Sequence, residues 1–293
     1  MHFLALSGAG ALAVGGLLAL DRIASRVVKP FPGEPDVTVP DLGIPHEDIQ
    51  ISSGDHTLNG WLLHPAGTAR PPLVLLAHGW GANYGTLLQL AEPLVRRGYE
   101  VLLFDIRGHG RNDEVAYATV RHFRDDVMAV AAYAARRFPE RPAVLLGHSL
   151  GGAAGVLAVA EGATLAGLGL LASPADVMEV TALYMSEKGL PGNLMVRLLR
   201  PFWWARVRGT FGPLTPSRRI LDVKVPVLVV HPENDRRVPM AHAERMAAGA
   251  QTSVRVVENA RHTEFLGREE THAFVLAFLE EIEGGAVEDQ DRL

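Results

Sequence analysis

The sequence contains no cysteine, which excludes disulfide bonds, cysteine nucleophiles and metal sites built on thiolates. Positive charge is in the minority, with 28 lysines and arginines against 33 acidic residues and a formal net charge of −5. Because a nucleic-acid-binding surface needs excess positive charge, this balance argues against a nucleic-acid partner. The 12 histidines include no pair at helical spacing beside a carboxylate, and we predict neither a metal ion nor a cofactor.

Charged residues are also missing from one long N-terminal segment, Phe3 to Leu20. As a helix, this segment would be about 27 Å long and just able to cross a hydrocarbon core. No basic residue precedes it and no good cleavage site follows it, which disfavours a signal peptide. We therefore expect residues 1–29 to form a membrane anchor or an uncleaved signal, with export by a signal peptide as the alternative.

The side of the membrane is predicted by the basic residues that follow this segment. Arg22, Arg26 and Lys29 flank its C-terminal end. Because basic flanks stay on the cytoplasmic side, we expect the rest of the chain to lie in the cytoplasm.

Beyond the N-terminal segment, the chain divides into a linker and one domain. Residues 30–45 are rich in proline and have no helical period, so we expect an extended linker. From residue 46 to 285, apolar runs typical of buried strands alternate with helical patterns, after an initial hairpin. This alternation predicts a doubly wound, mostly parallel α/β sheet. A helical cap is expected at about 174–220, and residues 286–293 are expected to form a frayed tail.

Residues with complementary chemistry follow three of the predicted strands. Ser149 follows "AVLLG", Asp235 follows "VPVLVVH", and His262 follows "TSVRVVE". Parallel strands bring their carboxyl ends to the same edge of a sheet, so these three side chains are expected to meet. A serine hydroxyl needs an imidazole to take its proton, and that imidazole needs a carboxylate to orient it. We predict that Ser149 is a nucleophile, His262 its base and Asp235 the orienting acid.

Glycines surround Ser149 in "GHSLGG", and we expect Gly147 and Gly151 to permit a sharp turn from strand to helix. The first backbone N–H after the serine, that of Leu150, then points toward a developing oxyanion. A second donor is predicted at Trp80 in "HGWG". Two rival assignments are weaker: Glu233 as the acid and His272 as the base.

The chain order of serine, acid and histidine resembles that of the α/β-hydrolase superfamily. In that superfamily the nucleophile lies in Gly-x-Ser-x-Gly between a strand and a helix. The resemblance covers roughly residues 47–283 and includes "HGWG", "DIRGHG", "GHSLGG" and "DRRVP". Within the superfamily, "GHSLGG" together with "HGWG" is similar to esterases, monoacylglycerol-lipase-like enzymes and serine aminopeptidase-like hydrolases. Two positions depart from the common pattern: Arg261 where relatives often have glycine, and Asn112 where they often have serine.

The resemblance implies a serine hydrolase that cleaves carboxylic esters through an acyl-enzyme. An acyltransferase, a thioesterase or an amidase/peptidase with the same triad is the alternative, followed by a non-catalytic, membrane-tethered binding protein. We also expect structural roles for several polar residues near the motifs, which the resemblance implies for His78 and His109. These polar residues are His78, Asp105, His109, Asp125, Asp126 and His148.

The predicted cap contains several large apolar side chains. Met185, Trp203 and Trp204, together with Trp80, are candidates to bind substrate; the cap residues could equally attach the cap to the domain. With the expected anchor, they favour a small-molecule ester with an apolar acyl group near a membrane. The oligomeric state is left open.

Overall fold

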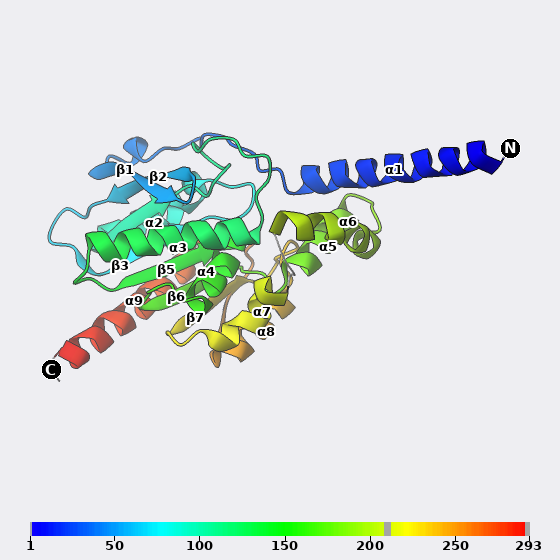
Figure 1. Ribbon diagram of the computed structural model, residues 1–293. Coiled ribbons are helices and arrows are strands. Elements are labelled where there is room, and N and C mark those ends of the chain that lie inside the picture. Colours follow the sequence, from blue (N-terminus) through cyan, green and yellow to red (C-terminus); the bar gives the residue numbers. More distant parts are fainter. Residues whose placement is uncertain (1, 208–211, 291–293) are drawn as a thin grey trace.

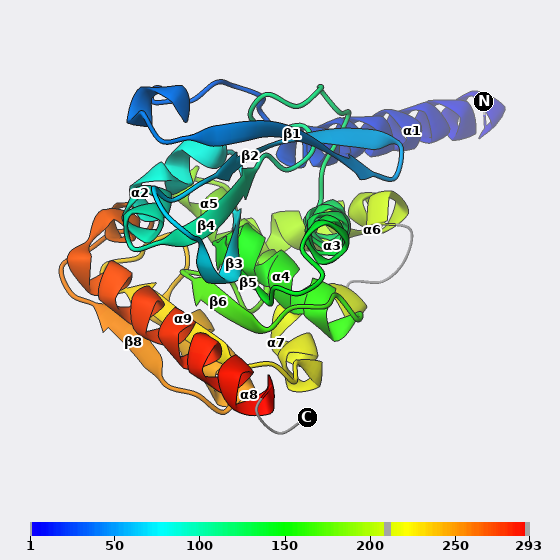
Figure 2. The same cartoon turned by 90° about the vertical axis from the view of Figure 1, so that its left-hand side faces the viewer.

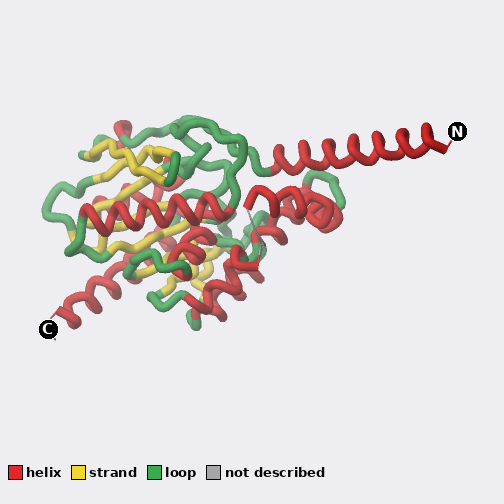
Figure 3. The backbone as a smooth tube through the Cα atoms, in the orientation of Figure 1, coloured by secondary structure: helices red, strands yellow, loops and turns green. Residues whose placement is uncertain are grey.

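The protein is described by a computed structural model that covers residues 2–207 and 212–290. Helix α1 (His2–Val27) projects from the body as a long arm (Figure 1). Helices lie on both sides of the strands, as expected for a doubly wound sheet (Figure 3).

One eight-stranded sheet has the order β1-β2-β4-β3-β5-β6-β7-β8. The strands are β1 (His46–Ser53), β2 (His56–Leu63), β3 (Arg70–Ala77), β4 (Tyr99–Phe104), β5 (Ala143–His148), β6 (Gly167–Leu171), β7 (Val227–Pro232) and β8 (Val254–Val257). The β1–β2 and β2–β4 pairs are antiparallel, and the pairs from β4 through β3 to β8 are parallel. The predicted α/β fold class is confirmed.

The continuous apolar runs form strands that are buried on both faces. In β3, Leu73 and Leu75 contact one core, whereas Val74 and Leu76 contact the other, because neighbouring side chains point to opposite faces. The first core lies under α3 (Val120–Arg137), α4 (Leu150–Ala160) and α8 (Met240–Ala250). The second lies under α2 (Leu88–Arg96) and α9 (Glu269–Gln290), on the opposite side of the sheet (Figure 2).

Helices fill the segment between β6 and β7 where a cap is predicted. They are α5 (Val177–Glu187), α6 (Gly192–Val207) and the short α7 (Pro216–Arg219). Asp176 begins α5 by accepting hydrogen bonds from the N–H groups of Met178 and Glu179. At the other end of the chain, residues 286–290 continue α9, and residues 291–293 of the predicted tail lie outside the described residues.

The prediction of a membrane anchor is not supported. Within the described ranges, no helix combines the length and the hydropathy that a membrane span requires. From Gly10, where the described side chains of α1 begin, the helix runs through three charged residues, Asp21, Arg22 and Arg26. Membrane contact as a partner interaction is likewise unsupported, and the cytoplasmic location stays a prediction.

The C-terminal end of α1 is instead docked on the protein. Ala24 is fully buried, and its carbonyl accepts a hydrogen bond of 3.0 Å from Nε1 of Trp203 in α6. Beside it, Arg206 of α6 forms an ion pair of 2.8 Å with Asp21. These contacts attach the arm to α6.

Candidate active site

Ser149 occupies the turn between β5 and α4 with a φ angle of +52° and a ψ angle of −122°. A side chain in this region of φ is strained, so surrounding contacts must hold it. The N–H of Ser149 donates to the carbonyl of Leu171 at 2.8 Å, and its own carbonyl accepts from Gly152 and Ala153. The next strand and the first turn of α4 therefore fix the serine at the carboxyl end of the sheet.

The neighbouring glycines serve close packing rather than a positive φ. A Cβ atom on Gly147 would lie 2.4 Å from the backbone of Gly152, and one on Gly151 would lie 2.4 Å from the carbonyl oxygen of Ala77. The sequence analysis assigned the freedom of the turn to these glycines. In the structure the serine itself takes the positive φ, and the glycines let α4 approach the strands.

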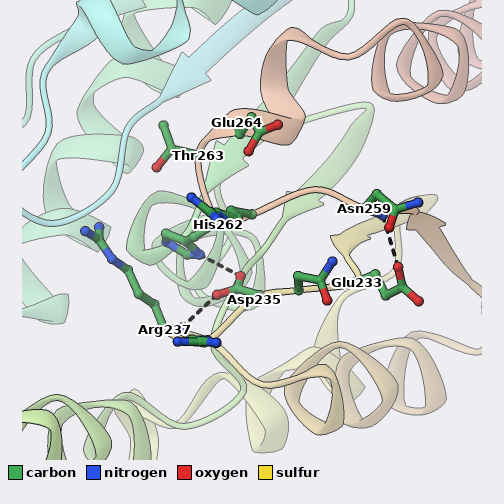
Figure 4. Close-up of a pocket in the computed structure, with 10 residues that line it drawn as sticks. Glu233, Asp235, Arg237, Asn259, His262, Thr263 and Glu264 are labelled. Carbon is green, nitrogen blue, oxygen red and sulfur yellow. Dashed lines mark hydrogen bonds and ion pairs between the residues drawn. The ribbon is translucent and has the colours of Figure 1, made fainter.

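Asp235 and His262 meet between the ends of β7 and β8 (Figure 4). The imidazole Nδ1 of His262 lies 2.7 Å from Oδ2 of Asp235, and both side chains are largely buried. The other carboxylate oxygen of Asp235 accepts hydrogen bonds of 2.9 Å from the N–H groups of Arg237 and Val238. Burial by itself would raise the pKa of Asp235, but the hydrogen bond to His262 and the backbone donors outweigh it and lower the pKa.

Ser149 and His262 line the same cavity, whose volume is about 180 Å³. Gly79, Trp80 and Gly81 of the "HGWG" loop also line it, and a Cβ atom on Gly79 would come within 2.8 Å of Cβ of Ser149. Neither the N–H of Trp80 nor that of Leu150 has an acceptor among the described residues. Two backbone donors next to the serine are thus free for a ligand oxygen.

Only one of the four residues proposed to bind substrate lines this cavity, and that residue is Trp80. Met185 and Trp203 are buried in the hydrophobic core that joins the cap to the body. Trp204 is partly exposed and lies beneath the guanidinium of Arg200, 5.0 Å from its ring. These three side chains belong to the cap, and none of them lines the cavity at Ser149.

Four lining residues were not predicted from the sequence: Ala82, Thr86, Arg237 and Thr263. Ala82 follows "HGWG", Arg237 lies in "DRRVP" and Thr263 follows His262, so three of the four had a neighbouring motif as a signal. The rival residues have other partners: Glu233 accepts from the N–H of Asn259, and His272 donates to the carbonyl of Leu266.

The other histidines near the site are held in neutral form. Burial lowers the pKa of His78 and of His148 to about 3 in each case. The Nε2–H of His148 donates to the backbone carbonyl of His262 at 2.9 Å and so supports the loop that carries it. In the ranges that the structure describes, no group of three or more histidine, aspartate or glutamate side chains is arranged to hold a metal ion.

Comparison with known proteins agrees with this architecture. The family model described as serine aminopeptidase, S33, matches residues 69–205. A non-heme haloperoxidase of Rhodococcus erythropolis is 25% identical over 244 residues, which are 67% of this chain and 83% of that protein. A monoglyceride lipase of Rattus norvegicus is 34% identical over 122 residues, and the match covers 40% of each chain.

Among solved structures, an esterase of Pyrococcus furiosus superimposes with a TM-score of 0.69 and 21% identity, covering 87% of this chain and 97% of the esterase. At that identity the similarity establishes the fold alone. The match to the rat lipase spans less than half of that enzyme, so the lipase's activity is not carried over here. The sheet, the turn at Ser149 and these relatives together make the chain a member of the α/β-hydrolase superfamily.

Proposed function

We propose that the protein hydrolyses carboxylic esters through an acyl-enzyme formed on Ser149. The observation that carries the proposal is the 2.7 Å contact between Nδ1 of His262 and Oδ2 of Asp235. His262 and Ser149 also line the same cavity. A buried carboxylate at Nδ1 holds the imidazole so that its Nε2 is free to accept a proton. This is the arrangement that activates a serine hydroxyl.

The proposed reaction has two steps. Oγ of Ser149 attacks the ester carbonyl while its proton passes to Nε2 of His262, and the N–H groups of Trp80 and Leu150 stabilise the oxyanion. The bond to the alcohol oxygen then breaks, and His262 returns the proton to the departing alcohol. Water attacks the acyl-enzyme in the same way and releases the carboxylic acid and Ser149.

The cavity favours a short acyl group. Its 180 Å³ correspond to about six water molecules at the volume of liquid water. Trp80 is the large apolar side chain in its lining, whose other members include Gly79, Ala82 and Thr86. A long apolar acyl chain would need more room than this cavity provides.

Replacement of the proposed nucleophile is the direct test. We expect Ser149→Ala to lower kcat for a neutral acetyl ester by about 10⁶-fold, the loss typical of a serine knockout in a triad. The variant should also lose labelling by a fluorophosphonate. The matched control is Ser52→Ala, an exposed serine of β1, which should keep the wild-type rate. An Ser149→Ala protein that retains the rate and the labelling would disprove the proposal.

The family match favours one second candidate, an amidase or peptidase, because the matching model describes serine aminopeptidases. The same triad would then attack an amide, and His262 would protonate a departing amine. Comparing kcat/KM for an acetyl ester with that for the corresponding anilide distinguishes the two activities.

A further inference from the structure

A second, wider cavity of about 1,040 Å³ lies beside the candidate triad (Figure 4). Charged side chains dominate its lining. They are Glu233, Asp235, Glu264, Arg236, Arg237 and Arg261, with His262 between the two cavities.

The three carboxylates of this lining already have partners within the protein. Asp235 accepts from His262 and from two backbone N–H groups. Glu233 accepts a hydrogen bond of 3.0 Å from the N–H of Asn259, and Glu264 pairs with Arg268 on the same turn. Their capacity to bind a cation from solution is thereby reduced.

The three arginines of the lining, unlike the carboxylates, have no side-chain partner among the described residues. In the part of the chain that the structure describes, no ion pair or side-chain hydrogen bond engages Arg236, Arg237 or Arg261. Guanidinium groups on the body are commonly paired, as Arg137 is with Glu47 and Arg245 with Glu179. The wide cavity therefore offers guanidinium N–H donors that no partner among the described residues uses.

Arg237 connects the two cavities. It lines both the wide cavity and the smaller one that contains Ser149. Its backbone N–H is used by Asp235, which fixes the start of the side chain beside the triad. Figure 4 shows the side chain extending past Asp235 on the side of the His262 ring, with no interaction drawn to its guanidinium.

The position of His262 indicates which half of an ester would reach this arginine. The histidine must return a proton to the departing alcohol oxygen, so the alcohol portion lies on its side of the acyl carbon. His262 is also a wall of the wide cavity. The acyl group then occupies the smaller cavity, and the alcohol portion extends toward Arg237.

We propose that the wide cavity binds the alcohol portion of the substrate and that Arg237 pairs with an anionic group on it, a carboxylate or a phosphate. A guanidinium presents a planar set of N–H donors that matches both anions. This inference rests on the proposed ester hydrolysis. Arg237 is a specificity-determining residue in it and takes no part in proton transfer.

Three acetyl esters of one phenol framework test the inference. They are methyl 4-acetoxybenzoate, which is neutral, 4-acetoxybenzoate, which carries a carboxylate, and 4-acetoxyphenyl phosphate. We expect the wild-type enzyme to have a higher kcat/KM for at least one anionic ester than for the neutral one. The preference should weaken as salt concentration rises, because an exposed charge pair is screened. The better of the two anionic esters identifies the anion.

Variants of Arg237 separate recognition from catalysis. We expect Arg237→Gln to lower kcat/KM for the preferred anionic ester about tenfold, the effect of losing one charge-assisted hydrogen bond at an exposed site. The rate with the neutral ester should stay within about twofold, since no catalytic donor is lost. Arg237→Lys should retain part of the preference. The matched control, Arg136→Gln, removes an exposed arginine of α3 and should change neither rate.

Each result decides the question. Equal rates for neutral and anionic esters in the wild type, or an equal loss for both in Arg237→Gln, would overturn the inference while leaving ester hydrolysis intact. If the neutral ester is not hydrolysed in a manner that depends on Ser149, the proposed function itself fails, and this inference fails with it.

Discussion

Two aspartates at the ends of parallel strands show how one residue type acquires two different roles. Asp105 follows β4 and Asp235 follows β7, and both are buried. Each carboxylate accepts two backbone hydrogen bonds of 2.9 Å, from Tyr84 and Arg111 at Asp105 and from Arg237 and Val238 at Asp235. Each also has a histidine Nε2 atom at 3.8 Å that makes its hydrogen bond elsewhere.

The two aspartates differ in burial, since Asp105 is fully buried and Asp235 is 8% exposed, and in a third hydrogen-bond donor. Burial raises the pKa of Asp105 to about 7 despite its two backbone donors. At Asp235 the additional hydrogen bond to His262 reverses the effect of burial and lowers the pKa. Weaker burial and the imidazole donor together lower the pKa of Asp235, whereas full burial raises that of Asp105.

The histidine next to Asp105 is unable to supply that donor. Nε2 of His78 accepts a hydrogen bond of 3.0 Å from the N–H of Ile106, and its Nδ1 lies 2.8 Å from the carbonyl of Gly79. Both ring nitrogens are used by the backbone, so the ring faces Asp105 without a proton to give. We infer that Asp105 and His78 hold the loops that follow β3 and β4.

The largest expected effect comes from removing the charge at Asp235. We expect Asp235→Asn to lower kcat about 10⁴-fold while the protein remains folded, because an amide no longer favours the imidazole tautomer that accepts the serine proton. Steady-state kinetics together with circular dichroism measures both properties. Glu233→Gln is the matched control and should keep the wild-type kcat. A comparable loss in both variants would remove the distinction between these neighbouring acids.

The same substitution at the other strand end should affect stability instead. We expect Asp105→Asn to lower the free energy of unfolding by about 1–3 kcal/mol, because the amide NH₂ faces one of the two backbone N–H donors. The kcat of the folded enzyme should change little. Chemical denaturation measures the stability, with the exposed Asp48→Asn as control. A loss of kcat as large as that of Asp235→Asn would place Asp105 in the catalytic machinery.

A smaller effect is expected in the pH dependence of stability. The pKa of Asp105 is raised from 3.8 to about 7, so the folded state binds a proton that the unfolded chain releases between these values. Its contribution to stability is therefore complete below pH 3.8 and declines as the pH rises toward 7.

Comparison with Asp105→Asn isolates this contribution, because the buried histidines titrate equally in both proteins. The stability advantage of the wild type over the variant should grow as the pH falls from about 7 to about 4. Denaturant unfolding at several pH values within that range measures it. An advantage that shrinks on acidification would show that Asp105 is ionised in the folded protein.

Local sequence pattern was sufficient for most of the architecture. Continuous apolar runs such as "PLVLLA" are buried on both faces in the structure, because a central parallel strand has a core on each side. A turn at Ser149 was similarly predictable from "GHSLGG", although Ser149 rather than a glycine takes the positive φ. These features depend on residues close together in the chain.

The contacts of the large side chains were less predictable. Trp203 was a candidate for binding substrate, yet its indole donates to the carbonyl of Ala24, which lies far away in the sequence. The N-terminal segment was interpreted from its length, its lack of charge and its flanking residues, whereas the end of its helix is packed against α6. An aromatic or apolar pattern indicates that a residue prefers burial. It does not indicate which surface of the protein covers that residue.

By itself, the sequence determined the order of strands and helices and the strand ends that carry Ser149, Asp235 and His262. Periodicity and residue size are local properties, so they can be read without a structure. The tertiary structure alone decided that the backbone uses both ring nitrogens of His78, and that Arg237 faces both cavities. Those outcomes depend on which atoms meet across the fold, and hydrogen-bond geometry of that kind is absent from a linear pattern.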